Sequence, residues 1–181
     1  MLKRYMHNRE REHAMRDDNR IVREFEWGTE YITDNANGDD PRKLFSEFSK
    51  NAIENSDEFF FSPEGLEFQL KLAEAQQEGR PTSELPTLTW TSGITTPSKE
   101  NNTVYGHWFP HESNKKAAVL VLPHWNAKAG TYFDLCKVFN KVGLSALRLT
   151  LPYHEARMPP ELDRADYLVA PNVGRTLQSL R

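Results

Sequence analysis

The sequence predicts an α/β protein in which antiparallel strands lead into parallel βαβ units, with a helical extension at the N-terminus. Three observations favour this fold class. Residues 88–94 and 103–109 are short β-prone runs separated by a polar loop, as expected of two antiparallel strands. The run 117–122 is apolar at every position, which is typical of a strand covered on both faces in a parallel sheet. A polar loop, a helical pattern and a further strand follow it, which is the order of a βαβ unit.

Residues 1–84 are expected to form an arm, a helix and a first strand. Residues 1–24 carry many charges and few apolar side chains, which indicates a surface arm or helix. The aromatic side chains in 25–28 are expected to anchor this arm on the main body. Asp39-Asp40-Pro41 combines a capping residue with a first-turn proline and predicts the start of a helix. Residues 66–72 alternate apolar and polar side chains, which predicts a half-exposed strand.

Residues 85–181 are expected to form a partial α/β domain. Gly79, Pro81 and Pro86 lie among charged side chains and mark an exposed connection at its boundary. The elements predicted beyond it are strands at 88–94, 103–109 and 117–122, a helix at 131–142 that stops at Gly143, a strand at 145–151, and a helix from about Asn172 that is unfinished at Arg181.

Composition excludes several classes of function. The net charge of −3 argues against general nucleic-acid binding, and no apolar run approaches the roughly 20 residues that span a bilayer. The single cysteine, Cys136, cannot form an internal disulfide, which favours a reducing compartment such as the cytoplasm. It lies in a helical pattern, which favours a buried core thiol. His107 and His111 are four residues apart, but they lie in a β-prone stretch without acidic or cysteine partners, so neither a metal nor a cofactor is expected.

Candidate functional residues follow the ends of two predicted strands. His124, Trp125 and Asn126 come directly after the run that ends at Leu122, and Tyr153 and His154 come after the strand that ends at Leu151. Ligands of open α/β sheets bind beyond the carboxyl ends of the parallel strands, so this edge is the expected site.

The segments Val119-Leu-Val-Leu-Pro-His124-Trp125-Asn126 and Gly143-Leu-Ser-Ala-Leu-Arg-Leu-Thr-Leu-Pro152-Tyr-His154 resemble the first half of an α/β-hydrolase, near the bacterial dienelactone-hydrolase-like proteins. That family places a His-Gly-x loop after its third strand, and here Trp125 replaces the glycine. The likeness implies a serine-type enzyme acting on ester-like acyl substrates through an acyl-enzyme.

The resemblance also implies roles for the loop residues. One oxyanion donor of the family comes from the loop after the third strand, which makes the Asn126 backbone N–H the first candidate and Trp125 the second. The Trp125 indole is an alternative wall of the acyl pocket. His124 precedes any nucleophile elbow, so it is expected to orient the loop rather than act as the base. Tyr153 and His154 either line the pocket or pack beneath it.

The sequence contains no Gly-x-Ser-x-Gly or Gly-x-Cys-x-Gly. In the family, a helix like the one that begins near Asn172 leads to the strand that carries the nucleophile. Nucleophile, acid and base are therefore expected beyond residue 181, and the chain is expected to be a fragment that is inactive alone. The alternative is a complete, non-catalytic ligand-binding module that uses a pocket at the ends of the strands at Leu122 and Leu151. A nucleotide-binding domain is disfavoured because the loop lacks both glycine-rich phosphate motifs.

Overall fold

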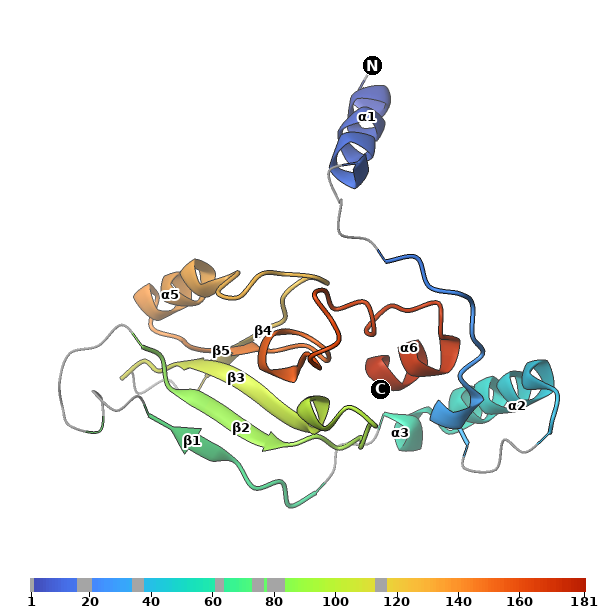
Figure 1. Cartoon of the computed structure of the whole chain (residues 1–181). Coiled ribbons are helices and arrows are strands. Elements are labelled where there is room, and N and C mark those ends of the chain that lie inside the picture. The colour runs from blue at the N-terminus through green and yellow to red at the C-terminus, as the bar shows by residue number, and fades with distance from the viewer. Residues whose placement is uncertain are drawn as a thin grey trace.

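The computed structural model describes residues 2–15, 21–33, 38–60, 64–72, 77, 84–112 and 117–181, and its elements are shown in Figure 1. The residues that the structure describes have mixed α/β content, with one five-stranded mixed sheet and several helices. Among the described residues, no helix is both long enough and apolar enough to cross a membrane.

The helix predicted from Asp39-Asp40-Pro41 is confirmed, and of the arm or helix expected in residues 1–24 a helix is observed. Helix α1 spans Leu2–Met15, and the described side chains on it are exposed, as expected of a charged surface helix. Helix α2 spans Pro41–Glu54, where the Asp40 side chain caps the first turn by accepting from the Arg42 N–H at 3.0 Å. A short 3-10 helix at Thr29–Tyr31 lies between them, and helix α3, Ser56–Phe59, follows α2.

The aromatic pair before α2 anchors the N-terminal segment, as predicted. The Trp27 ring lies 5.5 Å from the buried Phe45 of α2, and Phe25 contacts Trp27 edge-on at 5.2 Å between centroids. Trp27 is therefore the inner member of the pair, while Phe25 remains largely exposed.

The sheet has the order β1-β2-β3-β5-β4. Its strands are β1 (Gln69–Lys71), β2 (Thr87–Thr91), β3 (Thr103–Phe109), β4 (Ala118–Val121) and β5 (Ser145–Leu149). Strands β1, β2, β3 and β5 pair antiparallel in that order, and β4 and β5 pair parallel. Helix α5, Phe133–Lys141, makes the crossover between β4 and β5 and ends before Gly143 (φ 84°), the predicted stop.

Two details of the sheet differ from the prediction. Parallel βαβ units are predicted in the plural, but the described sheet holds one parallel strand pair, β4 with β5, which lies at its end. Strand β4 was expected to be covered on both faces, but Leu120 and Leu122 are more than half exposed. The reason is that Val119 and Val121 face the core beside α5, whereas Leu120 points to the opposite face, where no described element covers it.

The first strand is shorter and more exposed than the alternation at 66–72 predicts. Only Gln69–Lys71 pairs with β2, and all three side chains are exposed. Phe68 lies against Trp90 at 5.4 Å, but Leu70 stays more than half exposed because β1 is the opposite edge of the sheet. Most of the predicted connection at 73–86 lies outside the described residues.

One face of the sheet packs against α5. Cys136 is fully buried there with Phe109, Val121 and Ala146, and Phe133 and Phe139 pack around this cluster. The core-thiol prediction for Cys136 is confirmed, and burial raises the pKa of its thiol, which disfavours the reactive thiolate.

Helix α6, Val173–Leu180, begins beside the N-terminal segment (Figure 1). The Asn172 side chain caps it by accepting from the Arg175 N–H at 2.9 Å, so the predicted entrance is confirmed. The Val173 N–H donates to the Glu26 carbonyl at 3.1 Å, and the Gly174 N–H donates to the Trp27 carbonyl at 2.9 Å. The first turn of α6 is therefore hydrogen-bonded to residues 26 and 27 of the N-terminal segment, which are distant from it in sequence.

Candidate functional site

The loop after β4 carries the first group of candidate residues. Asn126 adopts a left-handed backbone conformation with φ 61°, which asparagine tolerates better than most side chains. Trp125 does not have a positive φ. Trp125 therefore needs no glycine-like conformation, and the adjacent Asn126 makes the sharp bend.

Asn126 and His154 are brought into direct contact. The Asn126 backbone N–H donates to His154 Nε2 at 2.8 Å, and His154 Nδ1 lies 2.8 Å from the Pro152 carbonyl. Because a backbone N–H can only donate and a carbonyl can only accept, the imidazole must be neutral with its proton on Nδ1. His154 is only 3% exposed, so it packs beneath the loop, and the candidate oxyanion donor is occupied in this structure.

A second loop fixes the position of the first. The Trp125 indole N–H donates to the Ala165 carbonyl at 3.0 Å, and the Ala165 N–H donates to Asn126 Oδ1 at 3.2 Å. Two neighbouring residues of one loop are thus tied to both backbone groups of a single alanine. The sequence offered no signal for Ala165, because its contribution is entirely through the backbone.

The Trp125 ring also lines a surface cavity of about 410 Å³. The Arg164 guanidinium lies 5.7 Å from the ring centroid, and Val169 and Pro171 add apolar surface. Trp125 therefore lines a cavity, but neither Asn126 nor His154 does.

His124 and Tyr153 lie apart from the Asn126–His154 contact. The His124 imidazole is exposed, and its Nδ1 lies 3.0 Å from the Tyr132 hydroxyl within the same loop. Tyr153 is 1% exposed and packs edge-on against Tyr167 at 5.5 Å between centroids, while its N–H donates to Asn101 Oδ1 at 3.1 Å. Of the two arrangements expected for Tyr153, packing beneath the surface is the one observed.

Sequence reasoning missed a buried charge network beside the site. Arg148 of β5 is fully buried, and its Nη1 lies 2.6 Å from Glu155 Oε1, a short contact that is poorly directed for a hydrogen bond. The other carboxylate oxygen lies 3.7 Å from His107 Nε2. Burial alone would raise the pKa of Glu155, but the contacts with His107 and Arg148 outweigh it and lower that pKa. The signal was present, since Arg148 is the one charged residue of β5, whose other members are Ser145, Ala146, Leu147 and Leu149.

The arrangement can present one backbone donor to an acceptor, but it assembles no nucleophile. Among the described residues, no serine hydroxyl is hydrogen-bonded to a histidine side chain, and no group of three potential metal ligands occurs in the same part of the chain. His107, one of the two histidines considered for a metal, contacts Glu155 instead.

The Asn126–His154 contact is expected to break in acid. Burial lowers the pKa of His154, and the nearby Arg148 and Arg157 add to that effect, against the opposing influence of the Pro152 carbonyl and Glu155. Below about pH 6.5 the His154 side chain therefore binds a proton in the unfolded chain but not in the folded chain. The stability of the fold decreases as the pH is lowered from about 6.5 to the depressed pKa of His154. The Asn126 amide resonance should then shift in ¹⁵N–¹H spectra, because protonated Nε2 cannot accept. A His154→Phe variant should remove this shift, and a wild-type resonance insensitive to acid would contradict the contact.

No model of a known protein family matches the chain, and no curated protein matches it either.

Proposed function

We propose that the chain supplies the oxyanion-hole portion of a serine-type α/β-hydrolase that acts on ester-like acyl substrates through an acyl-enzyme. The observation that carries the proposal is the Asn126 N–H, which lies just beyond the carboxyl end of β4 and is directed at an acceptor atom 2.8 Å away. A backbone donor held in this position after a parallel strand is what stabilisation of an oxyanion requires.

In this proposal the substrate oxygen takes the place of His154 Nε2 as the acceptor of the Asn126 N–H. A developing oxyanion accepts more strongly than a neutral imidazole nitrogen, so the exchange favours the charged transition state over the resting contact. Each donor of this kind contributes about 10²–10³ in rate. The hydrogen bonds that Ala165 accepts from Trp125 and donates to Asn126 keep the loop in place during the exchange. The loop therefore needs little reorganisation to present the Asn126 N–H to the substrate.

The Trp125 cavity is the proposed place for the acyl group. Trp125 precedes the donor residue in the chain, and Val169 and Pro171 add apolar surface to the indole, while Arg23, Arg164 and Asp166 add charged side chains to the lining. Nucleophile, acid and base are proposed to lie beyond residue 181, as the resemblance implies, with the full protein in the cytoplasm.

The test compares this chain with the product of its complete reading frame. The 181-residue chain should leave p-nitrophenyl acetate unhydrolysed and should not be labelled by a fluorophosphonate, because no described serine has a histidine base. The product of the complete frame should carry a Gly-x-Ser-x-Gly turn and show both activities. Asn126→Gly should retain most of that hydrolysis, because glycine keeps the N–H and accepts φ 61°.

Two results would overturn the proposal. One is stoichiometric labelling of a serine in the 181-residue chain, which would show that the nucleophile is already present. The other is a complete reading frame that ends at Arg181, or that continues without hydrolytic activity.

A second candidate function is a non-catalytic ligand-binding module. The observation that favours it is that the Asn126 N–H already has a partner in His154, so the site is satisfied without a substrate. A complete 181-residue product that binds a small molecule and hydrolyses no ester would support this candidate.

A further inference from the structure

The face of the sheet that is turned away from α5 is apolar across its whole width. Successive side chains of a strand point to opposite faces, so the strand pairing shows which residues share this face. Leu70 of β1 lies opposite Leu88, and Trp108 of β3 lies opposite Leu147, which in turn lies opposite Leu120 of β4. Within β1 to β5, no charged residue occupies this face.

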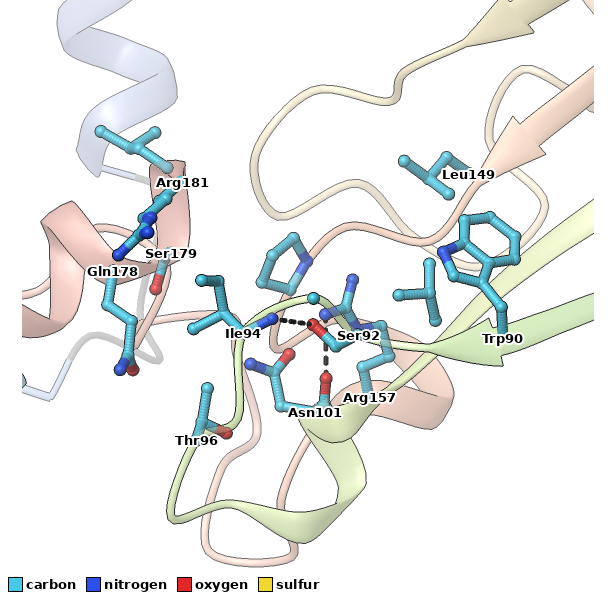
Figure 2. A pocket seen from close by; sticks show the side chains of 14 residues that line it. Trp90, Ser92, Ile94, Thr96, Asn101, Leu149, Arg157, Gln178, Ser179 and Arg181 are labelled. Atoms are coloured by element: carbon cyan, nitrogen blue, oxygen red, sulfur yellow. Dashed lines mark hydrogen bonds between the residues drawn. The ribbon is translucent and has the colours of Figure 1, made fainter. Parts of the chain in front are cut away.

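The pattern of β1 and β2 shows that this is the face that the strands bury. On the α5 side these two strands carry only glutamine, lysine and threonine side chains, which suit contact with water. The described helices cover one corner of the apolar face. Figure 2 shows Trp90 and Leu149 on the sheet side and Gln178 and Ser179 on the α6 side of a cavity of about 290 Å³.

The two edges of the apolar face are open. Phe68, Leu70, Leu120 and Leu122 are each 53–58% exposed, and Phe68 belongs to this face because its ring lies 5.4 Å from that of Trp90. A large apolar residue presents about 150–250 Å² when fully exposed, so these four leave about 400 Å² open. The half-buried side chains between them raise this to about 600 Å², the upper end for the largest apolar patch on a monomer.

We propose that a second copy of the chain covers this face, sheet against sheet, in a symmetric dimer. Two copies bury about 1,200 Å² in total, which exceeds the roughly 1,000 Å² expected of a specific interface. A two-fold dimer places the same patch on both sides, and a face without charged residues meets its own copy without like-charge repulsion. The inference concerns the 181-residue chain and does not rest on the proposed hydrolase function.

The first test is sedimentation equilibrium of the 181-residue protein between about 1 and 100 µM, since an interface near the lower size limit is expected to have a Kd of about micromolar. The weight-average mass should rise from that of a monomer to that of a dimer over this range. Raising the salt from about 0.1 to 1 M should not weaken the dimer, because screening acts on charges and the face has none.

Two variants test both edges of the face. Leu120→Lys on β4 and Leu70→Lys on β1 should each raise the dimer Kd about tenfold or more, because each places an unpaired ammonium in an apolar interface. Leu135→Lys is the matched control: this leucine is exposed on α5, on the other side of the sheet, and its replacement should leave the Kd unchanged. Circular dichroism checks that each variant folds.

The tryptophan side chains provide a measurement on the unmodified protein. Two of the four, Trp90 and Trp108, lie on the proposed interface, whereas Trp27 packs on Phe45 and Trp125 is bonded to the loop after η3. In ¹⁵N–¹H spectra, the indole resonances of Trp90 and Trp108 should shift with protein concentration, and those of Trp27 and Trp125 should not.

Three results would overturn the inference. A monomer at the highest concentration would show that the face does not hold a second copy. A dimer weakened by Leu120→Lys but not by Leu70→Lys would show that the copies pair along the β4 edge and not through the face. A dimer in which the indoles of Trp90 and Trp108 do not shift would place the interface elsewhere on the molecule.

Discussion

Glu155→Ala is expected to destabilise the protein by about 3–5 kcal/mol, because it removes the charge that faces a buried arginine. Arg148 is fully buried, and its carboxylate partner is Glu155, whose Oε1 lies 2.6 Å from Arg148 Nη1. The guanidinium also donates a long hydrogen bond from Nε to the Thr131 carbonyl at 3.3 Å and lies 5.9 Å from the Phe133 ring centroid, but neither contact supplies a full negative charge. Alanine therefore leaves a desolvated cation. Residue 155 has φ 48°, but this backbone strain is common to both side chains and does not enter the difference.

Urea unfolding at near-neutral pH measures the effect of Glu155→Ala. The double variant Arg148→Met with Glu155→Ala should regain most of the lost stability, because an apolar side chain in place of the buried charge removes the uncompensated cation. Asp134→Ala is the matched control: its exposed ion pair with Lys137 at 3.0 Å should contribute less than about 1 kcal/mol. Equal losses in Glu155→Ala and the double variant would mean that the carboxylate acts through packing and not through charge.

The same pair determines how stability responds to acid. The pKa of Glu155 is lowered in the folded protein, so its contribution is present above the ordinary carboxylate pKa and is lost as the pH falls through the depressed value. Protonation of His154, whose pKa is also lowered in the folded protein, likewise reduces the stability as the pH falls. Glu155→Gln should therefore flatten the acid limb of the stability profile.

The local elements of this chain were predictable because their signals are local. Asp40 before Pro41, Asn172 before α6 and Gly143 after α5 each mark a helix boundary through a cap or a left-handed turn, and each boundary was placed within a few residues. The strands β2, β3 and β5 were likewise apparent from short β-prone runs. These features depend on near neighbours in sequence.

Pairing and coverage were not predictable in the same way. An apolar run such as the one at β4 shows that a strand can be buried on both faces, but its position at the end of the described sheet depends on which strands pair with it. The candidate site shows the same limit. The sequence places Asn126 and His154 at one edge of the sheet, but it does not predict their hydrogen bond or the bond from Trp125 to Ala165. Each of these bonds joins a side chain to a backbone group, and the backbone partner carries no residue-type signal.

The contact between α6 and the N-terminal segment gives the second large effect. Gly174 is buried, and a Cβ at this position would lie 1.8 Å from the Gly28 carbonyl oxygen, a backbone atom that cannot move without displacing its segment. In an exposed helix, Gly→Ala would stabilise by about 1 kcal/mol through helix propensity. Here the steric conflict should dominate, and Gly174→Ala should destabilise by about 3 kcal/mol, at the upper end of overpacking effects.

Hydrogen exchange identifies the part of the molecule that Gly174→Ala releases. The amides of Val173 and Gly174, which donate to Glu26 and Trp27, should lose protection, while the amides of β3 and β5 keep theirs. Ser49→Ala on the exposed face of α2 is the control for propensity alone and should be neutral or slightly stabilising. If Gly174→Ala were as stable as the wild type, the backbone of residues 26–28 would have to move away from α6 at no cost, which the three-way pairing of Glu26 with Pro171, Asn172 and Val173 makes the least expected result.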